Sequence, residues 1–66
     1  MSGRENLFFG NYQIIEGQIY AVFYDIFSGE NRLMTRDDCA TRLAKLKKNK
    51  IPFNETQKAI DGWPRY

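Results

Sequence analysis

The alternation of apolar and polar residues predicts strands in the first half of the chain. The longest apolar run, residues 19–27, is rich in aromatic and β-branched residues and contains no Gly or Pro, which is typical of a buried strand. Shorter strands are predicted at residues 11–15 and 32–34. Residues 16–17 and 28–31 separate the three runs, and each of these segments holds a glycine that permits a tight turn. Two successive hairpins predict an antiparallel meander.

After Thr35 the apolar residues recur every three or four positions, which is the spacing of an amphipathic helix. The predicted stripe consists of Cys39, Ala40, Leu43, Ala44 and Leu46. Thr35 and Asp38 have the spacing of a capping box, and the helix is expected to end near Asn49, before Pro52.

A short second helix is predicted over residues 55–61, with Asn54 as its N-cap and Gly62 and Pro64 after its end. The predicted fold class is therefore α+β: a three-stranded antiparallel β-meander, one amphipathic helix and a short C-terminal helix or tail. Residues 1–10 are predicted to be an N-terminal arm, and residues 11–66 a single small domain.

Both faces of the central strand are apolar, since side chains alternate along a strand. We expect Val22, with Tyr20 or Tyr24, to pack beneath the helix with Leu43 and Leu46. The opposite face then needs cover, either from the tail at residues 53–66 or from a second copy, because exposed apolar patches are uncommon on monomers. A 66-residue chain also buries only about 60% of its unfolded surface, so we expect a homodimer.

The predicted protein interface comprises Ile19, Phe23, Asp25, Phe27, Phe53 and Trp63. Asp25 interrupts an apolar strand, and a buried carboxylate without a partner is costly. Asp25 is therefore expected to be exposed or to pair with Arg32 or Arg36 across the hairpin.

Charge is unevenly distributed, with a net charge of −3 over residues 1–31 and +5 over residues 32–66. The candidate nucleic-acid-binding residues are Arg36, Arg42, Lys45, Lys47, Lys48 and Lys50. The alternative is that these cations only favour the C-terminal end of the helix and keep its face soluble.

The order of elements from Gly10 to Lys48 resembles the arm-type DNA-binding domain of phage integrases, in which a three-stranded sheet precedes a helix. The matching helix positions are Thr35, Ala40, Leu43 and Leu46. The resemblance implies that the sheet is presented to the DNA major groove. The sequence departs from that family in the surface concerned, because it offers Glu16, Asp25 and Glu30 where basic or polar residues are usual.

The chain has no His and a single cysteine, Cys39, so no zinc site, cofactor or internal disulfide is expected and the commonest general base is missing. Cys39 lies on the apolar stripe and is interpreted as structural. No membrane-spanning run, signal-peptide core or Gly-rich phosphate loop is found. The sequence thus predicts a cytoplasmic, non-enzymatic interaction module, of adaptor or inhibitor type, without a small-molecule substrate. Its composition is typical of phage or mobile-element accessory proteins, and nucleic-acid binding is the alternative.

Overall fold

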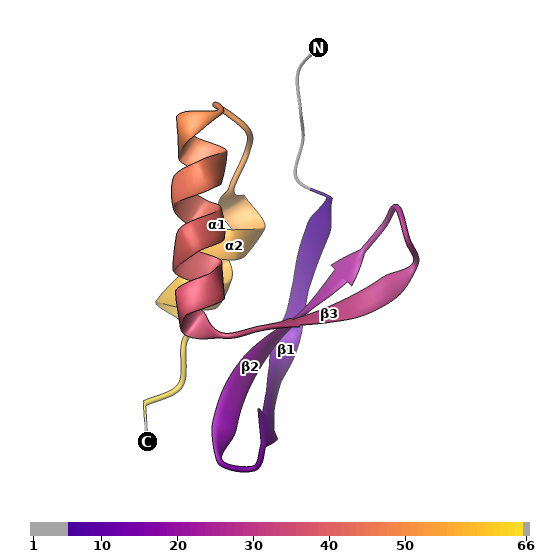
Figure 1. The fold of residues 1–66 in the computed structure, drawn as a ribbon, viewed down its shortest axis with the longest axis vertical. Coiled ribbons are helices and arrows are strands. Elements are labelled where there is room, and N and C mark those ends of the chain that lie inside the picture. The colour runs from indigo at the N-terminus through magenta and orange to yellow at the C-terminus, as the bar shows by residue number, and fades with distance from the viewer. Residues whose placement is uncertain (1–5, 66) are drawn as a thin grey trace.

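The computed structural model describes residues 6–65, which form a three-stranded antiparallel sheet followed by two helices (Figure 1). The elements are β1 (Leu7–Ile15), β2 (Gln18–Asp25), β3 (Glu30–Met34), α1 (Arg36–Lys48) and α2 (Asn54–Asp61). The strand order is β1-β2-β3. This confirms the predicted α+β meander. The strand limits differ from the prediction, because β1 begins within the segment predicted as an arm and β2 ends before Ile26.

Each hairpin turn has a local cause. Glu16 and Gly17, between the paired residues Ile15 and Gln18, both have positive φ, at 50° and 80°. Two positive φ values match the right-handed twist of the flanking strands. At the β2–β3 turn, Oδ1 of Asp25 accepts hydrogen bonds from the backbone N–H groups at positions 27 and 28, at 2.9 and 3.3 Å. A side-chain acceptor of this kind is a usual way to close a turn.

A β-bulge at Gly10 lets the two halves of β1 contribute to the same face. The register with β2 shifts between Phe9 and Asn11, so that Gly10 is the extra residue. Phe9 and Tyr12 are three positions apart and would point to opposite faces in a regular strand. With the bulge they lie together, and their ring centroids are 4.9 Å apart.

Helix α1 has the predicted N-terminal cap. Thr35 Oγ1 accepts a hydrogen bond from the Asp38 N–H at 3.1 Å, and Asp38 Oδ2 accepts one from the Thr35 N–H at 3.2 Å. The helix ends at its C-cap, Asn49, as expected. Lys50 follows with φ of 56°, a left-handed conformation in which Gly is usually found.

Helix α2 begins one residue earlier than predicted. Phe53 occupies the N-cap and makes no side-chain capping bond, while Asn54 is the first helical residue. The prediction of Asn54 as N-cap is therefore wrong. Instead, α2 is held by β1: the Phe9 N–H donates to Glu55 Oε1 at 3.0 Å, and the Tyr12 hydroxyl donates to the Ala59 carbonyl.

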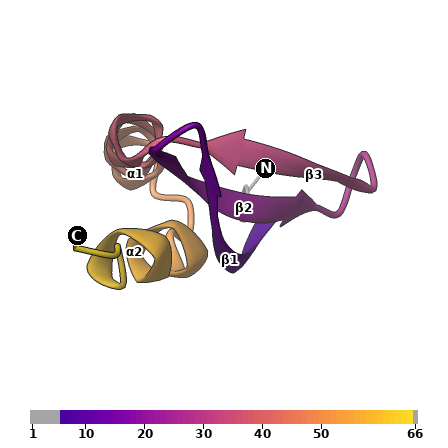
Figure 2. The same ribbon diagram turned by 90° about the horizontal axis from the view of Figure 1, so that it is seen from below.

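Both helices lie on the same side of the sheet, with α2 against β1 and α1 against β2 and β3 (Figure 2). The buried core cluster consists of Leu7, Ala21, Phe23, Cys39 and Ala59. Three of these five side chains are small, which allows the helices to approach the sheet closely. The prediction that the core lies on the face of Val22 and Tyr24 is therefore wrong. The core lies on the opposite face of β2, that of Ala21 and Phe23.

Candidate functional site

The sheet face turned away from the helices carries no charged residue along its three strands. Pairing register and alternation assign to this open face Phe8, Asn11, Gln13, Ile15, Gln18, Tyr20, Val22, Tyr24, Asn31 and Leu33. Its large side chains are accessible: the exposed fractions are 46% for Phe8, 47% for Tyr24 and 46% for Leu33. Within residues 6–65 neither helix packs on this face.

The charged residues of the strands lie on the opposite, helix-covered side. Asp25 pairs in register with Glu30, and Phe23 with Arg32. Glu30 and Arg32 therefore share the helix-covered face of Asp25 and Phe23. The resemblance to integrase domains implies that the opposite, open face would be presented to DNA. The open face thus has aromatic, aliphatic and amide side chains, with neither the acidic residues expected from the sequence nor the basic residues of that family.

The residues predicted as a protein interface are not brought together on one accessible surface. Phe23 has no exposed area, and Asp25 is only 4% exposed. Ile19 is half-buried on the same face as Phe23. Phe27 lies in the β2–β3 turn and is 73% exposed. The prediction that the face of Ile19 and Phe23 is free to bind a partner is wrong, because the helices cover it.

The two aromatic residues of the tail take different positions. Trp63 packs on the core, with its ring centroid 5.2 Å from that of Tyr12 in an edge-on arrangement. Phe53 is half-buried, and Lys47 Nζ lies 5.2 Å from the centroid of its ring. The sequence left open whether the tail or a second copy of the chain covers the face of Phe23. The structure places the tail on this face.

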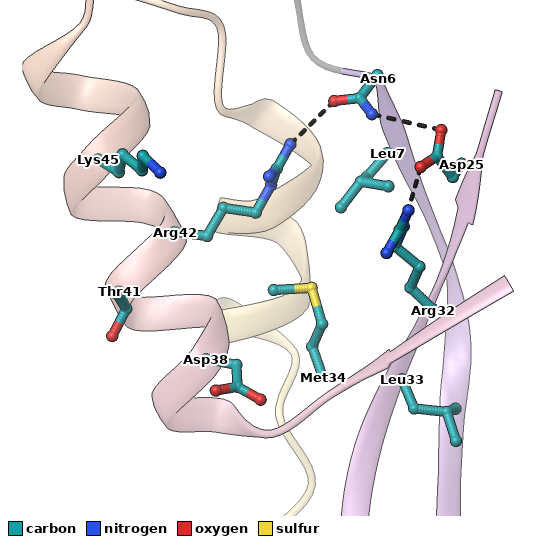
Figure 3. A pocket seen from close by; sticks show the side chains of 10 residues that line it. All are labelled: Asn6, Leu7, Asp25, Arg32, Leu33, Met34, Asp38, Thr41, Arg42 and Lys45. Carbon is teal, nitrogen blue, oxygen red and sulfur yellow. Dashed lines mark hydrogen bonds and ion pairs between the residues drawn. The ribbon is translucent and has the colours of Figure 1, made fainter. Parts of the chain in front are cut away.

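Asp25 is the centre of a polar chain that joins the sheet to α1 (Figure 3). Its Oδ2 accepts from Arg32 Nε at 2.9 Å, which confirms the predicted pairing with Arg32. Its Oδ1 lies 3.4 Å from Asn6 Nδ2, and Asn6 Oδ1 accepts from Arg42 Nη2 at 3.1 Å. The hydrogen bond from Arg32, followed by those from the turn N–H groups, lowers the pKa of Asp25 to about 2.

The six candidate nucleic-acid-binding residues are spread around α1 and its end. Arg42 and Lys45 line a groove with Arg32, whereas Arg36 lines a separate hollow beside Trp63. Lys47 lies over Phe53. Lys48 and Lys50 are exposed. The structure therefore does not gather these cations into one stripe.

The groove beside Arg42 lies between α1 and the sheet and has a volume of about 610 Å³ (Figure 3). Leu7 and Met34 supply its apolar lining, and Asp38 and Lys45 lie along its helical side. Arg42 Nε is buried and has no hydrogen-bond partner within the described part of the chain. Sequence reasoning missed this groove, because its residues come from all three strands and α1 and no local motif links them.

The single thiol is held in its protonated form. Cys39 is fully buried; that burial, and to a smaller extent the charge of Asp38, raises its pKa to about 11. Among residues 6–65 no three potential metal-ligating side chains come together. In the same part of the chain, neither helix has the length and apolar character needed to cross a membrane.

No protein-family model, curated protein sequence or solved structure matches the chain. Functional inference therefore rests on the open face and the groove themselves.

Proposed function

We propose that this protein is a small interaction module that binds protein through its open face, and that a second copy of the chain is the first partner of this face. The observation that carries the proposal is the complete absence of charge along the three strands of this face, in a chain of which 27% of the residues are charged. The centres of protein interfaces are depleted in charged residues and enriched in Tyr and Phe.

The size of the open face indicates a modest affinity. Phe8, Tyr24 and Leu33 each expose nearly half of their side chain, which gives about 300 Å² together at roughly 200 Å² for a large side chain. The rest of the open face adds area of the same order. A stable interface buries about 800 Å² per partner, so a homodimer formed through this face alone is expected in the micromolar to high micromolar range.

Self-association suits this surface for an electrostatic reason. Two copies of an uncharged face meet without placing like charges opposite each other, which would disfavour a symmetric pair. Two sheets packed face to face lie about 10 Å apart and interdigitate their side chains. The amide side chains of Asn11, Gln13, Gln18 and Asn31 remain available for hydrogen bonds at such an interface.

Sedimentation equilibrium between about 10 µM and about 1 mM, the range of the expected affinity, tests the proposal. We expect the average mass to rise from 7.8 kDa towards twice that value. Leu33→Glu should keep the chain monomeric, because it buries a charge without a partner. Ile14→Glu is the matched control, because Ile14 is 56% exposed but lies on the other face. If the wild type stays monomeric at the highest concentration, self-association is refuted. If Ile14→Glu dissociates the dimer and Leu33→Glu does not, the interface is not the open face.

Nucleic-acid binding by the cations of Arg42–Lys50 stays a prediction, supported by the exposure of Lys48 and Lys50. Affinity for duplex DNA should then fall steeply between about 50 and about 200 mM salt, because phosphate contacts release counterions. Replacing Lys45, Lys47, Lys48 and Lys50 with Gln should abolish binding. Absence of binding by the wild type at about 50 mM salt would end this alternative.

A further inference from the structure

We propose that the groove between α1 and the sheet binds a small organic anion, in which a carboxylate or phosphate monoester group is attached to an apolar body. The anionic group is bound by Arg42 and Lys45, and the apolar body lies against Leu7 and Met34 (Figure 3). This site shares only Leu33, at its rim, with the open face.

The charges that line the groove favour an anion. Both of its carboxylates have partners of their own: Asp25 pairs with Arg32 at 2.9 Å, and Asp38 accepts from the Thr35 N–H at the start of α1. In the described residues, neither Arg42 nor Lys45 forms an ion pair. The groove lining therefore carries three cations, including Arg32, against two carboxylates, a formal net charge of +1.

The hydrogen bonding of Arg42 is incomplete. Nη2 donates to a neutral amide oxygen, that of Asn6, at 3.1 Å, and the buried Nε has no acceptor among residues 6–65. A buried charged donor without an acceptor is costly, and such groups call for an explanation. The guanidinium group matches the two oxygens of a carboxylate or phosphate, so a bound oxyanion supplies the acceptor that Arg42 lacks. Lys45 is three positions further along α1 and therefore neighbours Arg42 on the helix surface.

The groove also has room and an apolar wall for the rest of the ligand. Its volume of about 610 Å³ falls within the roughly 300–1,000 Å³ of small-molecule sites. Leu7 is almost fully buried beside it, and Met34 is half-buried. Met is unbranched and adapts its shape to an apolar partner. Leu33 contributes to the rim, but its side chain points away from Arg42 (Figure 3).

Titration of the full chain with naphthoate, naphthyl phosphate and the neutral naphthalenemethanol, followed by backbone amide NMR, tests this site. We expect both anions to bind saturably and at least ten times more tightly than the alcohol, with the largest shifts at Leu7, Met34 and Arg42. The tighter of the two anions identifies whether the group recognised is a carboxylate or a phosphate. Equal binding of the alcohol, or shifts centred on Phe8 and Tyr24 of the open face, overturns the proposal.

Two variants and a matched control separate recognition from general charge. Lys45→Gln should weaken anion binding several-fold, and Arg42→Lys, which keeps the charge but loses the planar fork, should weaken it at least tenfold. Lys48→Gln removes the same charge from an exposed position of the same helix outside the groove and should leave the affinity within about twofold of that of the wild type. Lys45 is exposed, so Lys45→Gln tests the site even if Arg42→Lys fails to fold. Equal weakening by Lys45→Gln and Lys48→Gln refutes a defined site.

Discussion

Phe23→Ala tests which face of β2 forms the core. Phe23 has no exposed area, and its ring centroid lies 5.7 Å from that of Phe9. Truncation removes the full transfer free energy of a buried ring, about 1.5–3 kcal/mol, and leaves a cavity, so a Phe→Ala change typically costs about 3–5 kcal/mol. The core of a chain this short rarely supplies more than about 3–5 kcal/mol of stability. Phe23→Ala should therefore be largely or wholly unfolded at room temperature.

The adjacent residue provides the control. Tyr24 points to the open face and is 47% exposed, so Tyr24→Ala should cost no more than about 1 kcal/mol. Urea unfolding at low micromolar concentration, followed by far-UV circular dichroism, measures both changes. With a slope near 1 kcal/mol per M, a loss of about 4 kcal/mol moves the midpoint by about 4 M. Phe23→Leu retains part of the packing and gives a measurable midpoint if Phe23→Ala does not fold. A larger loss for Tyr24→Ala than for Phe23→Ala refutes the assignment of the faces.

Three further predictions concern the chain's polar and backbone features. Asp25→Asn should be less stable than the wild type at neutral pH, and the difference should vanish as the pH falls from about 4 through about 2. In the wild type, the lowered pKa of Asp25, about 2, keeps the carboxylate charged in the folded state at pH values where the unfolded state takes up a proton. Urea midpoints of both proteins at several pH values measure this effect. A stability difference that does not change with pH contradicts the prediction. Lys50→Gly should stabilise the chain by up to about 1 kcal/mol, because Lys50 has φ of 56° and Gly adopts that region without strain; a lower thermal midpoint would contradict this. Thr35→Ala should cost about 1 kcal/mol by removing the acceptor for the Asp38 N–H, while Thr35→Ser, which keeps the hydroxyl, should recover most of that loss in the same urea assay.

The order and type of the elements could be predicted from the sequence because their signals are local. The capping box at Thr35 and Asp38, the glycine in each turn and the pairing of Asp25 with Arg32 all depend on residues less than eight positions apart. Each of these features appears in the structure as expected.

The assignment of the two faces could not be predicted in the same way. Both faces of β2 are apolar, so alternation alone does not tell which face the helices cover. The discriminating residues are Leu7 and Phe9, which add apolar area to the face of Phe23 only because of the bulge at Gly10. A bulge changes the alternation by one position. The glycine that could indicate it, Gly10, lies in the segment predicted as an arm and not in a predicted strand.

The contact between Glu55 and β1 has a consequence for how the sheet can grow. An exposed edge strand is a template on which further chains can add, and addition at both edges propagates into a fibre. At the β1 edge, the Phe9 N–H is already bound to Glu55 Oε1 at 3.0 Å, so an incoming strand must first displace α2 from that point. Growth of the sheet is thereby directed to β3. If two copies joined through their β3 edges, the two outer edges of the combined sheet would both be β1 edges blocked by Glu55. Strand addition would then stop at a dimer and would not continue into a polymer.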